Sequence, residues 1–255
     1  MIPAGPIPLR FHYSAFPHPH VVVEELLPPE VYGRLRFPDG RIAPEAKWGL
    51  TASDAGYASL LAEDPEWRSL HDLLRGEDFV HAMLREFSGD LRRAECLVDP
   101  LRARVVPFVE SREEKELAML STTADPNEVF TRLDFQSKSA GSYRDFVHLD
   151  WARRIVGGIF FFSDAEEEGL EGGELALYRD RDFRGDRWCH DPELTALFPP
   201  KHNSGVIFLN SNEGFHGPRA ITALRGRRRW LYYTISSRVD VWPCAMREPA
   251  LATRR

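Results

Sequence analysis

The sequence predicts a mainly β protein, built as a sandwich or a jelly-roll barrel, with supporting helices in its N-terminal part. From residue 102 onward, short apolar runs alternate with separators rich in Gly, Pro, Asp and Asn. No helix-length amphipathic segment lies between the later runs, so alternating strand and helix units with a parallel sheet are disfavoured. The length of 255 residues and the hydrophobic content of 43% allow one large core. We therefore expect a single domain over 1–255, with N-terminal support in 1–100 and a β core at about 101–240.

The N-terminal support begins with a short strand at 20–24, in "HVVVEELLPPE", where three β-branched residues stand together. Pro28 and Pro29 then indicate a turn or the start of a helix. The nearby pair His18 and His20 has the HxH spacing of some metal sites. Flanking prolines and the position before the strand indicate a structural role at the strand entry instead.

Two helices are expected after a loop that contains Gly and Pro. The first runs near 65–75, with Asp64 as N-cap, Pro65 at the first helical position and Gly76 as the stop. The second spans about 78–88, where an apolar stripe ends at a glycine. Both stripes are typical of helices that pack on a sheet.

The expected strands of the core share a short apolar run bounded by turn residues. They are 102–109 (RARVVPFV), 129–136 (VFTRLDFQ), 154–162 (RIVGGIFFF), 174–178 (ELALY), 205–210 (GVIFLN) and 228–236 (RRWLYYTIS). Gly172 and Gly173 are expected to form a hairpin turn before the fourth run.

Composition excludes several classes of function. The net charge of −6 gives no general basic surface, so we expect no nucleic-acid partner, although "RGRRRW" is a local exception. Three distant cysteines indicate neither a disulfide framework nor a CxxC zinc site, and they suit a reducing cytoplasm. No apolar run approaches the ~18 residues of a membrane span, and no signal peptide is evident. The sequence does not indicate an oligomeric state.

The strongest chemical signal is the pair His148 and Asp150, which stands just before an apolar strand. In an extended segment, residues two apart point to the same side, so the two side chains are placed to bind one ion. A second histidine, His216, follows in "NSNEGFHGPRA". Two imidazoles and one carboxylate form the facial triad of non-haem Fe(II) sites, whereas the lack of nearby cysteine argues against structural zinc.

This order of motifs resembles the Fe(II)- and 2-oxoglutarate-dependent oxygenases, in particular their prolyl hydroxylase-like branch. The order is HxD, a strand, a GGEL hairpin, a second strand, a histidine and an arginine-bearing strand, and the resemblance covers 16–27 and 130–237. It implies a double-stranded β-helix, a jelly roll of the cupin kind. It also implies that His148, Asp150 and His216 bind Fe(II) and form the catalytic centre, with 2-oxoglutarate and O2 as co-substrates.

The resemblance also implies an arginine that anchors the far carboxylate of 2-oxoglutarate. Arg229 matches the family spacing best and Arg227 is second; by strand alternation these two share one face, and Arg228 lies on the other. Gln136, on the strand that leads into the site, is a further candidate for the 2-oxoglutarate site. Phe161 stands where relatives tend to carry a tyrosine that helps hold the same carboxylate.

The predicted function is hydroxylation of an unactivated C–H bond, with release of succinate and CO2. Arg154, Trp151 and Tyr143 are the candidate substrate-binding residues. Arginines in the expected loops favour an anionic small molecule, such as an amino acid or another carboxylated metabolite, as substrate; these are Arg112, Arg144, Arg181, Arg184 and Arg187. Alternatives are a protein hydroxylase of the prolyl type, a cupin-like metal-binding protein that does not use 2-oxoglutarate, and a nucleic-acid demethylase of the same superfamily.

Overall fold

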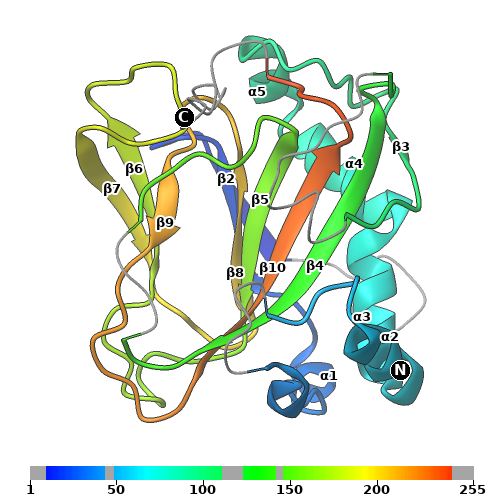
Figure 1. Cartoon of the computed structure of the whole chain (residues 1–255), viewed down its shortest axis with the longest axis vertical. Coiled ribbons are helices and arrows are strands. Elements are labelled where there is room, and N and C mark those ends of the chain that lie inside the picture. The colour runs from blue at the N-terminus through cyan, green and yellow to red at the C-terminus, as the bar shows by residue number, and fades with distance from the viewer. Residues whose placement is uncertain (1–9, 44–48, 111–122, 142–145, 243–255) are drawn as a thin grey trace, which may run out of the picture.

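Two β-sheets and a group of N-terminal helices make up the protein. The structure is a computed structural model that describes residues 10–43, 49–110, 123–141 and 146–242. Figure 1 shows three layers, in which the larger sheet lies between the helices and the smaller sheet. The mainly β composition with N-terminal helices is therefore confirmed. In the described stretches, no helix combines the length and the apolar character that crossing a membrane requires.

Seven strands form the larger sheet, in the order β1-β2-β8-β5-β10-β4-β3. Neighbouring strands are antiparallel, except that β3 runs parallel to β4. The strands are β1 (Arg10–Ser14), β2 (His20–Glu25), β3 (Arg104–Val105), β4 (Glu128–Lys138), β5 (Arg154–Phe161), β8 (Ser204–Leu209) and β10 (Arg228–Ser237). Most residues of β4, β5 and β10 are buried because both faces of the sheet are covered.

The smaller sheet has three antiparallel strands in the order β7-β6-β9. These are β6 (Leu175–Asp180), β7 (Pro192–Phe198) and β9 (His216–Pro218). The turn before β6 needs glycine, since Gly172 and Gly173 have φ of +79° and +76°. A Cβ on Gly172 would lie 1.7 Å from the carbonyl oxygen of Ala220. The pair therefore makes the expected change of direction, but not a hairpin, because β6 pairs with β7 and β9 while the preceding strand β5 lies in the larger sheet.

The two faces of the larger sheet bury different clusters. Its outer face packs against the helices, where Trp67 lies edge-on to Phe135 at 4.8 Å between ring centroids. Its inner face packs against the smaller sheet through an apolar cluster made of Phe161, Leu175, Leu177, Val206 and Phe208. Side chains on the inner face point toward the space between the two sheets.

The helices follow the N-terminal hairpin of β1 and β2. They are α1 (Pro29–Tyr32), the 3₁₀ turn η1 (Asp39–Arg41), α2 (Ala55–Glu63), α3 (Pro65–Arg75), α4 (Glu77–Glu86) and α5 (Ser88–Arg93). The expected helix at 65–75 is confirmed, and the Asp64 side chain accepts a hydrogen bond from the Trp67 amide at 3.0 Å. The expectation for 78–88 is wrong at its end, because α4 stops at Glu86 and Gly89 lies inside α5.

Most expected strands are present within a few residues, but several elements were not anticipated. Strand β1 precedes the expected first strand, and helix α2 and strand β7 lie in segments expected to be loops. The short elements η1, α5 and β9 were not expected either. Of the expected strand 102–109, only Arg104–Val105 pairs in a ladder. Pro107 lacks the N–H that a continued ladder would need.

Candidate metal centre

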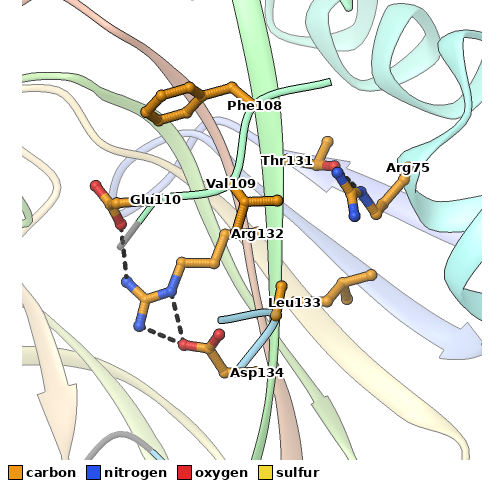
Figure 2. A pocket seen from close by; sticks show the side chains of 9 residues that line it. Arg75, Phe108, Val109, Glu110, Thr131, Arg132, Leu133 and Asp134 are labelled. Carbon is orange, nitrogen blue, oxygen red and sulfur yellow. Dashed lines mark hydrogen bonds and ion pairs between the residues drawn. The ribbon is translucent and has the colours of Figure 1, made fainter. Parts of the chain in front are cut away.

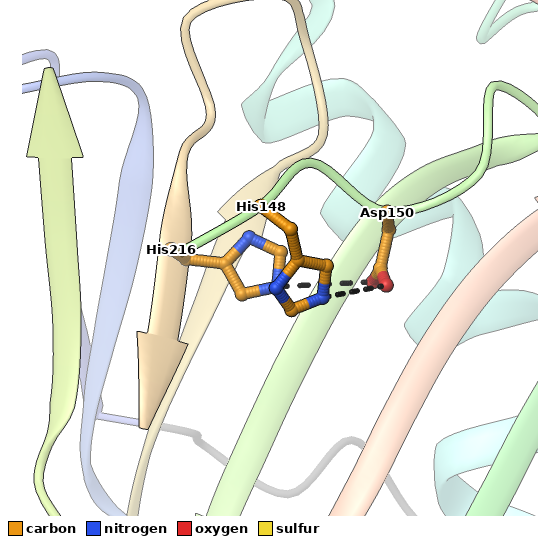
Figure 3. A group of neighbouring side chains, drawn as sticks. All are labelled: His148, Asp150 and His216. Carbon is orange, nitrogen blue, oxygen red and sulfur yellow. Dashed lines mark ion pairs between the residues drawn. The ribbon is translucent and has the colours of Figure 1, made fainter. Parts of the chain in front are cut away.

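His148, Asp150 and His216 converge on one point at the inner side of the sheets. One potential ligand atom from each lies within 4.8 Å of the others (Figure 3). The His148 Nε2 is 3.7 Å from Asp150 Oδ1, and the His216 Nε2 is 4.0 Å from Asp150 Oδ2. These separations are too long for hydrogen bonds, yet one ion between the three groups would need only a modest inward shift. Both imidazoles and the carboxylate suit ferrous iron, so the donor set fits that metal.

A backbone pairing brings the two histidines together although 68 positions separate them. The amide of each donates to the carbonyl of the other, at 3.0 Å in both directions. His216 begins β9, and its Nδ1 lies 2.9 Å from the carbonyl oxygen of Gly214. With Nδ1 engaged as a donor, Nε2 of His216 is the nitrogen that remains for a metal.

The turn that carries Asp150 is held by the buried Asn210. Its Oδ1 accepts from the Asp150 amide at 3.0 Å. Its Nδ2 donates to the carbonyls of Trp151 and Arg154, at 3.2 and 3.1 Å. One amide side chain thus fixes both ends of the turn between the aspartate and β5.

The connection between β6 and β7 covers the other side of the same segment. The Leu149 amide donates to the Arg187 carbonyl at 2.8 Å, and Trp188 pairs with His148 in a β-bridge. The Arg187 guanidinium carbon lies 4.0 Å from the centroid of the Trp151 ring. This connection therefore supports the candidate centre as well as bordering it.

The protonation states at the centre favour metal binding. Burial alone would raise the pKa of Asp150, but His148 and His216 lower it well below its usual range. Burial lowers the pKa of His216 to about 4, with a further contribution from His148. At neutral pH the carboxylate is charged and the His216 imidazole is neutral, which are the forms that coordinate a metal.

Strand β10 presents alternate residues to the centre. Tyr232 donates a hydrogen bond from its hydroxyl to Asp150 Oδ2 at 2.8 Å, so the face that carries Tyr232 is the inner one. Arg228 and Trp230 share that face by alternation. The buried Arg228 guanidinium lies 4.1 Å from the Trp230 ring centroid and 5.7 Å from that of Phe161.

Arg229 and Arg227, the two arginines expected to anchor 2-oxoglutarate, lie on the outer side. Arg229 donates to Asp39 Oδ2 at 2.6 Å and to Glu168 Oε1 at 3.1 Å. Arg227 donates to the hydroxyl and carbonyl of Ser137, at 2.6 and 3.0 Å. Both side chains therefore lie on the face of β10 opposite to Tyr232, and their role at a 2-oxoglutarate site stays a prediction. Gln136 pairs with Trp230 across β4 and β10, which places it on the inner face as the anchor site would need.

The candidate substrate residues have different surroundings. Tyr143 lies outside the described residues, as do Arg112 and Arg144. Trp151 is partly buried beneath Arg187. Arg154 is buried and donates to Glu110 Oε2 at 2.5 Å and to the Ser236 hydroxyl at 2.9 Å. It is thus engaged within the protein.

Arg154 belongs to a buried charge cluster beside the centre, defined by Glu110, Arg132, Asp134, Arg153 and Arg154. Figure 2 shows how Glu110 and Asp134 flank Arg132 in a pocket along β4. Burial would raise the pKa of Glu110, but the charges of Arg154, Arg153 and Arg132 lower it to about 2. Nothing in the spacing of the sequence motifs indicates Glu110 or Asn210, since both act through contacts distant in sequence.

Several solved structures resemble this one. A prolyl 4-hydroxylase from Phytophthora capsici has 15% identity, with 86% of this chain and 58% of that chain covered and a TM-score of 0.47. The chain therefore spans less than two thirds of that protein's length. A Pseudomonas putida prolyl-4-hydroxylase has 14% identity, with coverage of 86% and 93% and a TM-score of 0.40. A 2OG-Fe(II) oxygenase family oxidoreductase from Burkholderia pseudomallei has 14% identity, with coverage of 92% and 76% and a TM-score of 0.36.

These structural neighbours are prolyl hydroxylases and 2OG-Fe(II) oxygenases. No protein-family model and no curated protein matches the chain. The function is therefore inferred from the geometry of the candidate centre.

Proposed function

We propose that the chain is an Fe(II)- and 2-oxoglutarate-dependent dioxygenase that hydroxylates an unactivated C–H bond. The observation that carries this proposal is the convergence of His148, Asp150 and His216, with ligand atoms within 4.8 Å of one another. Such a donor set holds iron on one side and leaves the opposite positions open. When bound there, iron supplies O2 activation coupled to conversion of 2-oxoglutarate to succinate and CO2.

We further propose that Arg228, in place of Arg229 or Arg227, anchors the far carboxylate of 2-oxoglutarate. Arg228 is buried and projects from the inner face of β10, which also carries Tyr232 next to Asp150. Its planar guanidinium suits a carboxylate, and burial strengthens such a pair. Gln136 on the adjacent strand lies on the same face and remains a candidate contact. Phe161 has no hydroxyl to offer, and its ring packs near Arg228.

The strand order supports the finer fold assignment, a double-stranded β-helix in one oxygenase domain. The strands β8-β5-β10-β4 lie side by side in one sheet, and β7-β6-β9 form the other. His216 comes from the smaller sheet, while Asp150 stands just before β5 of the larger one. A metal between them would therefore tie the two sheets together.

The substrate is proposed to be a small anionic metabolite, with a protein substrate of the prolyl type as the alternative. Two of the loop arginines that favour an anion are already paired, since Arg181 donates to Asp191 and Arg184 to Asp182. Arg187 is also engaged, since its Nε donates to the Leu149 carbonyl at 3.2 Å and its guanidinium packs on the Trp151 ring. The proposal of an anionic substrate therefore rests on the position of Arg187 next to Trp188, which pairs with His148.

A product assay tests the proposed function and separates the two substrate classes. Purified protein is incubated with Fe(II), 2-oxoglutarate, O2 and either a metabolite extract or a peptide library, and succinate is measured together with untargeted product masses. We expect succinate that depends on all three additions, and a gain of one oxygen in a metabolite. The Asp150→Ala variant is the control. A product mass found only with peptides would favour the alternative, and succinate formation equal to that of Asp150→Ala would contradict the proposal.

A further inference from the structure

Among the described residues, Tyr232 is the tyrosine whose hydroxyl contacts a candidate metal ligand. Its hydroxyl donates to Asp150 Oδ2 at 2.8 Å. Each oxygen of Asp150 also faces an imidazole, since His148 Nε2 lies 3.7 Å from Oδ1 and His216 Nε2 lies 4.0 Å from Oδ2. The two oxygens therefore differ in that Oδ2 accepts a hydrogen bond from a phenol.

This asymmetry bears on how many positions a metal would keep open. Asp150 and the two histidines would hold a metal through one atom each, and the remaining positions would be available to a 2-oxo acid and O2. A carboxylate that bound through both oxygens would occupy one of those remaining positions. Keeping Oδ2 in a hydrogen bond to Tyr232 disfavours that second metal contact.

The Tyr232 ring is itself held in place by the neighbouring strand. The Arg132 guanidinium carbon lies 5.0 Å from the ring centroid, and the Arg132 Nε donates to Asp134 Oδ2 at 2.6 Å. Asp134 is the cross-strand partner of Tyr232 in the ladder between β4 and β10. The fixed cation over the ring contributes a cation–π contact that holds the ring in place.

We infer that Tyr232 is a positioning residue that holds Asp150 for one-oxygen coordination of the metal. This inference rests on the proposed function, because it assigns the contact a purpose at that same centre. Removing a partner of this kind from a metal-ligating carboxylate typically weakens metal affinity by roughly 10- to 100-fold. We expect the Tyr232 hydroxyl to fall at the lower end, about 10-fold.

The adjacent tyrosine provides a matched control. Tyr233 is buried on the opposite face of β10, where its ring lies 5.6 Å from that of Phe79. Its hydroxyl has no hydrogen-bond partner among the described residues. Tyr233→Phe therefore removes the same atom from the same strand without touching Asp150.

The experiment compares wild type, Tyr232→Phe and Tyr233→Phe by Mn(II) titration and by the visible charge-transfer band of anaerobic Fe(II) with 2-oxoglutarate. We expect Tyr232→Phe to bind Mn(II) about 10-fold more weakly and to shift the band, with Tyr233→Phe unchanged in both. Wild-type Mn(II) affinity and an unshifted band in Tyr232→Phe would overturn the positioning role alone. An equal loss in Tyr233→Phe would assign the effect to packing and also overturn it. Wild-type protein that neither binds Mn(II) nor forms the band would overturn the proposed function, and the role of Tyr232 with it.

Discussion

Arg228 and Tyr232 project from the same face of β10, the face that is turned toward Asp150. Tyr232 lies four positions after Arg228, which is about 13 Å along a strand at the usual rise per residue. A short dicarboxylate together with an arginine side chain spans such a distance. This relationship is the reason for assigning the 2-oxoglutarate anchor to Arg228.

Substitution of Arg228 tests that assignment. Arg228→Ala removes the charged partner of the far carboxylate, and losing such a pair in a buried site costs on the order of 2 to 5 kcal/mol. We expect the apparent KM for 2-oxoglutarate to rise by roughly thirty-fold or more. The measurement is succinate formation against 2-oxoglutarate concentration, with folding checked by circular dichroism.

Arg229→Ala and Arg227→Ala serve as controls on the same strand end, since their side chains pair with Asp39 and Ser137 on the outer side. Both should keep the wild-type KM. A thirty-fold effect in Arg229→Ala, with Arg228→Ala unchanged, would show that the inner face has been assigned to the wrong residues.

The sequence alone predicts that Arg228 lies on the opposite face of the strand from its two neighbouring arginines, but not which face points inward. Strand alternation alone separates Arg228 from Arg227 and Arg229, but it does not say which set points inward. That information comes from the contact between Tyr232 and Asp150, which joins two segments 82 residues apart. The spacing of His148 and Asp150, by contrast, is local, and the motif order sufficed to group them with His216.

The difference between local sequence patterns and contacts distant in sequence also explains which elements of the fold were not anticipated. Strands β4, β5, β8 and β10 are recognisable because their apolar runs are long and buried. Strand β7 contains a proline and a glutamate, and much of it is exposed or only partly buried, so its pattern is that of a loop. It becomes a strand through pairing with β6.

Metal binding should stabilise the folded protein when the triad is complete. We expect Mn(II) to raise the Tm of the wild type, by an amount equivalent to about 2.7 kcal/mol when the free metal is a hundred times its Kd. EDTA should reverse the shift. His148→Ala, Asp150→Ala and His216→Ala should each lose most of it, because a triad that lacks one ligand holds the ion weakly. A full shift in any of the three variants would contradict its role as a ligand.

Asn210 should affect both stability and metal affinity. Asn210→Ala leaves the Asp150 amide and two buried carbonyls without their partner, which costs about 1 to 3 kcal/mol per unsatisfied group at most. We expect a lower free energy of unfolding and weaker Mn(II) binding. Asn203→Ala is the comparison, since Asn203 makes an equivalent pair of bonds to Leu27 away from the centre. That variant should lose stability but keep its metal affinity, and weakened Mn(II) binding in both would remove the special role of Asn210.

Glu110 should make the free energy of unfolding depend on pH in the acidic range. Its pKa is lowered to about 2, because the three arginines outweigh the effect of burial. A carboxyl with a depressed folded-state pKa contributes stability above its unfolded-state pKa and loses that contribution as the pH falls toward the folded-state value. Between about pH 4.5 and pH 2, Glu110 should therefore account for about 3 kcal/mol of lost stability.

Urea denaturation of wild type and Glu110→Gln across this pH range measures the effect. The variant should be less stable at pH 7, because breaking a buried charge cluster typically costs about 3 to 5 kcal/mol. It should also lose less stability on acidification than the wild type does. Glu166→Gln, at an exposed position, is the control and should follow the wild type. Parallel pH profiles for wild type and Glu110→Gln would rule out this contribution.

We propose that His148, Asp150 and His216 hold an iron that 2-oxoglutarate can chelate. The most direct test is an anaerobic titration of the Fe(II)-loaded protein with 2-oxoglutarate, followed by visible absorption. We expect a saturable charge-transfer band with one-to-one stoichiometry, which is absent in Asp150→Ala and needs far more 2-oxoglutarate in Arg228→Ala. Protein that binds Fe(II) but develops no band at saturating 2-oxoglutarate would contradict the proposal.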